Sequence, residues 1–317
     1  MRESDINPAE NRLKPGINEG SLLDAIDTAG YPLQSVVASK LLAQFRVTEE
    51  WGYVDSESKQ HRSLDVFGFR VCSEGSEDAG FPCTAAILVE CKRSRAPFIF
   101  FKRVSEALIP QYPHVAGLGA GLRSLQTTTL LKITSVPLSS ILGLNDTPFV
   151  AAPPARCSAL ARAELNGDKV RLSGDDAYNS VVLPLVKATR HAESLYNGAG
   201  KKGSRLLTLI LPIAVIDAPM LLVETPQTSR DPVASPWLRI VRQEAREGDQ
   251  GWYRWDAIDA VHIGFLDAYL SDHLLPFLRT FASRVVRQKD VLRQGGIVED
   301  LSHWTWSEVQ PATRRGA

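Results

Sequence analysis

The stretch that decides the fold is Ala85-Ala86-Ile87-Leu88-Val89-Glu90-Cys91-Lys92. Its first five residues are all apolar, and a strand without a polar face belongs in the middle of a sheet that is covered on both sides. Side chains of a strand alternate between its faces, so Glu90 and Lys92 share one face and Cys91 lies on the other. The sequence therefore predicts a buried central strand that ends in an acid and a base on the same side.

An acidic partner for this pair is expected on the preceding strand. Residues 63–71 have the pattern of a strand, with Asp65 inside it. Residues 72–83, which follow, are rich in Gly, Ser, Glu and Asp, a composition typical of a hairpin loop. We therefore expect the two strands to be antiparallel neighbours and Asp65 to lie close to Glu90.

These residue types suit the hydrolysis of a phosphodiester bond. Two neighbouring carboxylates repel each other and are costly to bury unless a cation lies between them. Mg²⁺ is commonly held by one or two carboxylates together with waters and substrate phosphates, so Asp65 and Glu90 are predicted to bind Mg²⁺, with Mn²⁺ as a substitute. Lys92 would supply a positive charge that assists the attacking water and stabilises the transition state.

The strings Leu64-Asp65-Val66 and Val89-Glu90-Cys91-Lys92 resemble the PD-(D/E)xK motif of the restriction-endonuclease-like superfamily. Two earlier segments are similar to that superfamily as well, Gly30-Tyr31-Pro32-Leu33-Gln34 and Trp51-Gly52-Tyr53-Val54-Asp55. The resemblance covers residues 20–100 and 175–225. It implies an α/β fold with a restriction-endonuclease-like core, in which helices flank a mixed central β-sheet, and a metal-dependent nuclease with DNA as the expected substrate.

Two residues depart from the pattern of that superfamily. Leu64 occupies the position of the proline that gives the motif its name, a position that varies widely. Gln34 occupies the position where many members have a glutamate that helps to hold metal. A glutamine can hydrogen-bond a metal-bound water but brings no charge. Gln34 is therefore expected to orient such a water rather than to bind the ion.

The chain is expected to form a flexible N-terminal arm at residues 1–19 and a single domain at residues 20–317, with an insertion at about 98–175 that lies outside the central sheet. Proline and glycine punctuate that insertion and its periodicity is weak. The remaining periodic segments predict helices that start near Ser21 and Pro32 and helices at 175–196 and 267–286, and strands at 45–54, 206–216, 220–224 and 257–265.

The charge balance bears on the binding of nucleic acid. The chain of 317 residues has a formal net charge of +0, whereas nucleic-acid binders often carry a basic excess. Any phosphate-binding surface must then be a local patch. Arg93, Arg95, Lys102 and Arg103 are candidates for contacts with the backbone of the nucleic acid, and a solvated basic loop is the alternative. Three further acids are expected at the surface, outside the site: Glu49, Glu50 and Asp55.

The sequence contains no evident membrane segment. The first twenty residues are polar, so no signal peptide is expected. Residues 206–223 form the most apolar run, but Pro212, Asp217 and Pro219 interrupt it, which favours two buried strands. The four cysteines form no CxxC pair, so a structural zinc site is not expected and the thiols are expected to be reduced in the cytoplasm.

Three alternatives stand beside the hydrolytic site. Glu90 and Lys92 could form a solvated salt bridge at a strand end. The chain could be a non-cleaving nucleic-acid-binding or scaffold subunit that keeps the fold. It could also be an interaction protein in a multi-subunit assembly, with the nuclease active only in complex. A protein partner or a homo-oligomer is the candidate assembly. The apolar run before Glu90 and the presence of Asp65 favour the hydrolytic site.

Overall fold

The computed structural model describes residues 8, 10–72, 80–103, 112–118, 122–126, 133–201, 206–224, 231–245, 253–293 and 310–311. Residues 1–7 and 9 of the expected arm lie outside the described residues, and residues 10–18 form no helix or strand. The first two helices are α1 (Glu19–Thr28) and α2 (Gly30–Leu42). The N-cap of α1 is Asn18, whose side-chain oxygen accepts a hydrogen bond from the Ser21 N–H at 3.1 Å. The first helix thus begins slightly before the expected Ser21.

A mixed sheet of 12 strands forms the centre of the molecule. In spatial order its strands are β1 (Arg46–Val54), β2 (His61–Val71), β3 (Cys83–Arg93), β10 (Leu207–Asp217), β14 (Tyr253–His262), β13 (Trp237–Ala245), β8 (Arg156–Asn166), β4 (Phe98–Lys102), β11 (Met220–Val223) and β12 (Val233–Ala234), with β5 (His114–Gly117) paired to β10 and β9 (Lys169–Ser173) paired to β8. β2 is antiparallel to β3, as expected, while β3, β10 and β14 run parallel.

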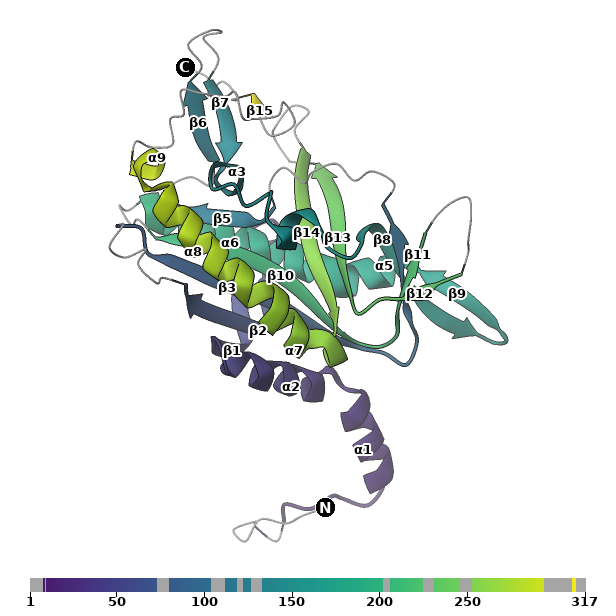
Figure 1. Ribbon diagram of the computed structural model, residues 1–317. Coiled ribbons are helices and arrows are strands. Elements are labelled where there is room, and N and C mark those ends of the chain that lie inside the picture. Colours follow the sequence, from purple (N-terminus) through teal and green to yellow (C-terminus); the bar gives the residue numbers. More distant parts are fainter. Residues whose placement is uncertain are drawn as a thin grey trace.

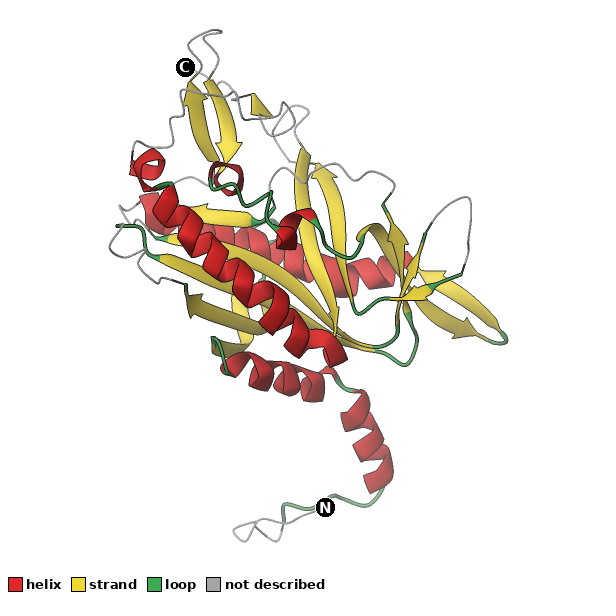
Figure 2. Ribbon diagram, in the orientation of Figure 1, coloured by secondary structure: helices red, strands yellow, loops and turns green. Residues whose placement is uncertain are grey.

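Helices cover both faces of this sheet (Figures 1 and 2). α2 and α8 (Leu275–Arg287) pack on one face together with the odd-numbered residues of β3. α6 (Leu183–Lys201) packs on the other face with Ala86 and Leu88. β3 is buried from Cys83 to Cys91. The prediction of an α/β fold whose central strand is covered on both sides is therefore confirmed.

The chain from β3 to β4 and the chain from β10 to β11 run side by side in parallel. The Ser94 N–H donates to the Asp217 carbonyl at 3.1 Å, and the Phe98 N–H donates to the Pro219 carbonyl at 2.9 Å, so pairing continues past the bend. β4 then pairs with β8, and β8 pairs with β13. The sheet is therefore curled. β11 follows β10 directly along the chain, yet in the order of paired strands it lies next to the last strand, β12.

The expected insertion at 98–175 is consequently wrong. β4, β5, β8 and β9 all belong to the large sheet. Of the described strands in that range, only β6 (Leu122–Gln126) and β7 (Ile133–Pro137) lie apart from it, in a small sheet with β15 (Gln310–Pro311). The polar residues and the proline of segment 93–97 suggest a loop, but this segment is only a bend between two paired strands.

The remaining helical segments agree with the predicted ones in place but are less regular. α5 (Gly174–Ala177), a π-helical segment at Tyr178–Val182 and α6 follow one another without a break. Pro184 therefore lies inside this helical run, directly after the π-helical segment, a combination typical of helix irregularities. α7 (Leu266–Ala268) and a π-helical segment at Tyr269–Leu274 likewise precede α8. The short elements are α3 (Leu138–Ile141), α4 (Pro148–Ala151), α9 (Lys289–Arg293) and a 3₁₀ turn at Ile263–Phe265. No described helix is long and apolar enough to cross a membrane.

Candidate active site

Asp65 lies where the pairing of β2 with β3 ends. The register of the two strands ends at Val66, which is opposite Val89. Just beyond this pair, the Cys91 N–H donates to Asp65 Oδ2 at 2.6 Å. The carboxylate thus takes the place that a backbone carbonyl has elsewhere in the ladder, which fixes it between the two strands and beside Glu90.

An interruption of the strand alternation produces this placement. Leu64 packs in the α6-side core, whereas Val66 packs in the core on the other side, although residues two apart in a regular strand share a face. On β1, Glu50 has a φ of 50°, a left-handed conformation that is uncommon outside glycine. The irregularity lies at Asp65 and orients its carboxylate along the sheet.

Glu90 and Lys92 leave β3 on the α6 side, as the alternation predicts. Glu90 is 6% exposed, and the Lys92 Nζ lies 2.6 Å from its Oε1. Burial raises the pKa of Glu90 to about 7, even though the charge of Lys92 lowers it, and the charge of Asp65 raises it further. Burial also raises the pKa of Asp65, although the hydrogen bond from the Cys91 N–H and the charge of Lys92 both lower it. Two carboxylates therefore compete for one ammonium group.

The donor set fits a hard divalent cation. Asp65 has one oxygen engaged by the Cys91 N–H and one remaining, and Glu90 is a buried carboxylate whose pKa is raised by burial although Lys92 lies beside it. Mg²⁺ needs only one or two protein carboxylates when waters and phosphate oxygens complete its shell. The described residues contain no group of three or more His, Cys, Asp or Glu that could hold a metal ion, so within them a cage made of protein ligands alone is absent.

Gln34 is not brought together with the acids. It is 5% exposed on α2, the helix that covers the face opposite Glu90 and Lys92. Within the described parts of the chain its side chain makes no hydrogen bond with Asp65 or Glu90. Its predicted role, which was to orient a metal-bound water, therefore gains no support from a contact.

Of the four predicted phosphate contacts, Arg93 and Arg95 directly follow the acids on the chain. A pocket of about 830 Å³ at this end of the sheet is lined by both arginines. Arg93 is already engaged, because its Nε lies 3.0 Å from Asp217 Oδ2 and its guanidinium donates to the Asp27 carbonyl. Arg95 is exposed and makes no ion pair with any described residue. Of these two arginines, Arg95 is therefore the one without an ion-pair partner among the described residues.

Lys102 and Arg103 lie at the far end of β4. Lys102 Nζ pairs with Glu224 Oε1 at 2.6 Å. The Arg103 guanidinium lies 4.7 Å from the ring centre of Trp255. Trp255 is near the start of β14, seven residues before His262, which is about 23 Å at 3.3 Å per residue. His262 lies at the end of the sheet where Lys92 is found, so the structure separates these two basic residues from the acids.

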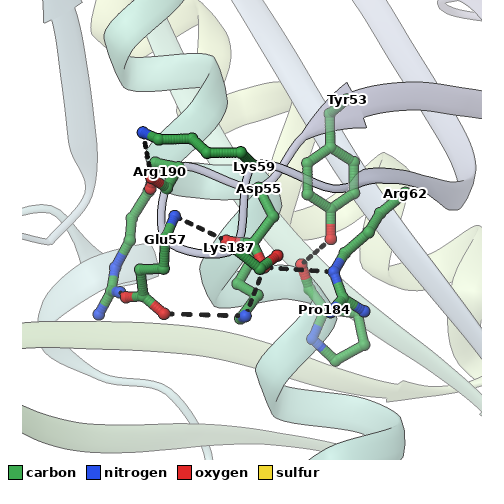
Figure 3. A network of polar contacts seen from close by, with 10 residues as sticks. Tyr53, Asp55, Glu57, Lys59, Arg62, Pro184, Lys187 and Arg190 are labelled. Carbon is green, nitrogen blue, oxygen red and sulfur yellow. Dashed lines mark hydrogen bonds and ion pairs between the residues drawn. The ribbon is translucent and has the colours of Figure 1, made fainter.

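Asp55 was expected at the surface, and this expectation is wrong. It is fully buried beneath α6, where its Oδ2 accepts hydrogen bonds from Lys187 at 2.5 Å, Ser58 at 2.7 Å and Arg62 at 3.2 Å (Figure 3). Burial alone would raise the pKa of Asp55, but the bonds from Lys187 and Ser58 hold it well below its usual range. The partner on α6 is far away in the sequence, so the local pattern could not indicate this cluster.

Tyr53 links the Asp55 cluster to the acid pair. It is buried on the α6 side, and its hydroxyl donates to the Pro184 carbonyl at 3.3 Å (Figure 3). Burial raises the pKa of Tyr53 to about 12; the charge of Arg62 lowers it, and the charges of Glu90 and Asp55 raise it further. Asp55 and Glu90 therefore both lie near enough to Tyr53 for their charges to act on its hydroxyl group.

No family model, curated protein or solved structure matches this chain.

Proposed function

We propose that the chain is a nuclease with a restriction-endonuclease-like core that hydrolyses phosphodiester bonds of DNA with Mg²⁺, for which Mn²⁺ can substitute. The observation that carries this proposal is the group of Asp65, Glu90 and Lys92, which lies where the pairing of β2 with β3 ends. Two carboxylates that share one lysine leave negative charge uncompensated in a largely buried place. A cation and a phosphate group together would satisfy that charge distribution.

The residues of the chain would divide the work as follows. Asp65 and Glu90 hold the cation, and the Cys91 N–H keeps the Asp65 carboxylate in place. Bound Mg²⁺ supplies polarisation of the phosphate and a lowered pKa of a coordinated water. As a ligand of that cation, Glu90 would no longer need the Lys92 ammonium as its counter-ion. Lys92 then faces the substrate, where it orients the attacking water and stabilises the negative charge of the transition state.

Cleavage assays with matched variants test this proposal. Purified protein is incubated with circular and linear DNA, and with RNA, in Mg²⁺, Mn²⁺ or EDTA. Cleavage of DNA should require the metal and should be lost in Asp65→Asn and Glu90→Gln. Asp168→Asn, which removes an exposed carboxylate from the β8–β9 turn, should cleave normally. Activity of Glu90→Gln equal to that of the parent would contradict the assignment.

One observation favours a second candidate. The Lys92–Glu90 contact of 2.6 Å is already a closed ion pair, and the described residues contain no group of three or more His, Cys, Asp or Glu that could hold a metal ion. A non-cleaving nucleic-acid-binding subunit would keep such a pair for structure alone. In that case the protein would bind DNA in a gel-shift assay but would leave it intact with either metal, both alone and with partner proteins added.

A further inference from the structure

Arg62 is an anchored arginine close to the acid pair. Its Nε donates to Asp55 Oδ2 at 3.2 Å, while 43% of its side chain is exposed. Within the described chain its two terminal amino groups make no hydrogen bond or ion pair. Arg62 precedes Asp65 by three residues on β2, which is about 10 Å along a strand. The side chain is therefore held at one nitrogen and available at two others.

The anchor itself is rigid. Asp55 Oδ1 accepts from the Glu57 N–H at 3.0 Å, and Oδ2 accepts from Ser58 and Lys187. A guanidinium fixed in this way loses little conformational entropy when its remaining N–H groups bind a ligand. Its planar fork matches the oxygens of a phosphate group. The geometry thus presents a preformed site for an anionic oxygen pair.

Arg62 lies on the same face of the sheet as the acids. It is directly opposite Tyr53 in the β1–β2 register, and Tyr53 packs in the α6-side core. Glu90 and Lys92 leave β3 toward that face. Around Arg62, the cations outnumber the acids: Lys59, Arg62, Lys187 and Arg190 gather about Asp55 and Glu57 (Figure 3). This is the kind of local basic patch that a chain with zero net charge needs in order to bind nucleic acid.

We propose that Arg62 binds a phosphate of the substrate strand beside the scissile one, through its two terminal amino groups. This inference rests on the proposed nuclease function and specifies where the substrate strand lies, which is over the start of β2 and the start of α6. Arg62 takes the place of Lys102 and Arg103 among the phosphate contacts, because those two residues lie apart from the acids.

The test measures binding apart from cleavage. Fluorescence anisotropy with labelled duplex DNA is recorded between low and moderate salt in a Lys92→Ala background, which leaves the Asp55 cluster intact. Adding Arg62→Ala should weaken binding by about tenfold or more, because one charge-assisted contact is lost. The slope of log Kobs against log salt should fall by about 0.9, the value for one phosphate contact. Adding Arg62→Lys keeps the charge but not the fork, so it should preserve the slope and lose part of the affinity.

Lys169→Ala is the matched control, since Lys169 is an exposed base on β9. If Arg62→Ala matches this control in affinity and slope while the Lys92→Ala parent binds DNA, the inference is overturned and the nuclease proposal stands. If the parent binds no nucleic acid and the native protein cleaves none, both fail. Arg62→Lys retains a cation beside Asp55, so it reports on the fork even if Arg62→Ala is poorly folded.

Discussion

The carboxyl group of Glu90 is buried beside Asp65 and Lys92, and its pKa is raised from 4.5 to about 7. Between these two values the folded protein binds more protons at this group than the unfolded chain does. Stability should therefore fall as pH rises from about 4.5 to 7 and stay low above that range. A shift of this size corresponds to about 3 kcal/mol. Glu90 therefore lowers the stability of the folded protein at neutral pH.

Glu90→Gln should remove this penalty. The amide has no charge to bury, and Lys92, with 28% of its side chain exposed, can direct its ammonium toward water. Urea denaturation at pH 8 should show the variant more stable than the parent by up to about 3 kcal/mol, with little difference near pH 4.5. Asp168→Asn should show no such pH dependence. An equal change at both pH values would mean that packing, rather than ionisation, sets the effect.

Lys92→Ala separates catalysis from binding. In the proposed nuclease, Asp65 and Glu90 are the metal ligands and are unchanged in this variant, so metal affinity at pH 8 should survive. Affinity for DNA should fall only modestly, because it is spread over many phosphate contacts. The chemical step should slow by about 10²–10³, by analogy with the loss of one preorganised donor at a transition state. Single-turnover cleavage and a binding titration on the same DNA give the two quantities. Parallel losses in both would make Lys92 a phosphate-gripping residue.

At this scale the sequence predicts some side chains well and others poorly. The shared face of Glu90 and Lys92 follows from strand alternation, because β3 is regular there. The orientation of Asp65 does not follow, since it depends on an irregularity coupled to the left-handed Glu50. Asp55 could not be recognised as buried at all. Its burial comes from α6, which is far away along the chain.

At the scale of elements, Asp55 joins the β1–β2 turn to α6. Lys187 is only 12% exposed and has Asp55 as its close partner at 2.5 Å. Asp55→Ala would leave Lys187 largely buried without that partner, which typically costs about 3–5 kcal/mol. Because the pKa of Asp55 lies below its usual range, this stabilisation should be complete at neutral pH and should fade only as pH falls below about 4.

Urea denaturation at pH 7 and at pH 3 measures this contribution. Glu57→Ala is a suitable comparison, since Glu57 belongs to the same cluster but 52% of its side chain is exposed. It should cost no more than about 1 kcal/mol. If Asp55→Ala were as mild as Glu57→Ala, the cluster would be a solvated surface network and Arg62 would have no firm anchor.

The elements also show which strands a sequence pattern can predict. β3 and β10 are long and apolar, so their apolar pattern alone identified them. β4 is short and follows Pro97, and β8 alternates three alanines with Leu160, Arg162 and Glu164. Such segments become strands because the curled sheet supplies partners on both sides. That is tertiary information, so the sequence pattern alone predicts residues 98–175 as an insertion outside the sheet.

At the scale of the whole molecule, a buried ion pair connects the curled part of the sheet to its helical cover. Arg239 on β13 is fully buried, and it binds Asp259 on β14 through two hydrogen bonds of 2.6 and 3.0 Å. It also donates to the Phe149 carbonyl at 2.9 Å, and the Tyr269 hydroxyl donates to Asp259 at 2.8 Å. Two strands, α4 and the π-helical segment at 269–274 thus meet at one charge pair.

This pair gives a prediction about cooperativity. Arg239→Met leaves Asp259 charged and unpaired in the core, and Asp259→Leu leaves Arg239 in the same state. Each single change should cost about 3–5 kcal/mol. The double variant removes both charges, so it should be more stable than the sum of the two losses implies, with a coupling energy of about 1–3 kcal/mol. Urea denaturation of the four proteins measures this cycle.

The double variant should not recover full stability, because the Phe149 carbonyl and the Tyr269 hydroxyl lose their partners at the same time. Each of these two lost buried hydrogen bonds costs about 1–3 kcal/mol, so the double variant should remain several kcal/mol less stable than the parent. Arg239→Lys keeps the charge without the fork and should fall between the parent and Arg239→Met. Strict additivity of the two single changes would mean that Arg239 and Asp259 act independently, and the curled sheet would then owe its closure to apolar packing alone.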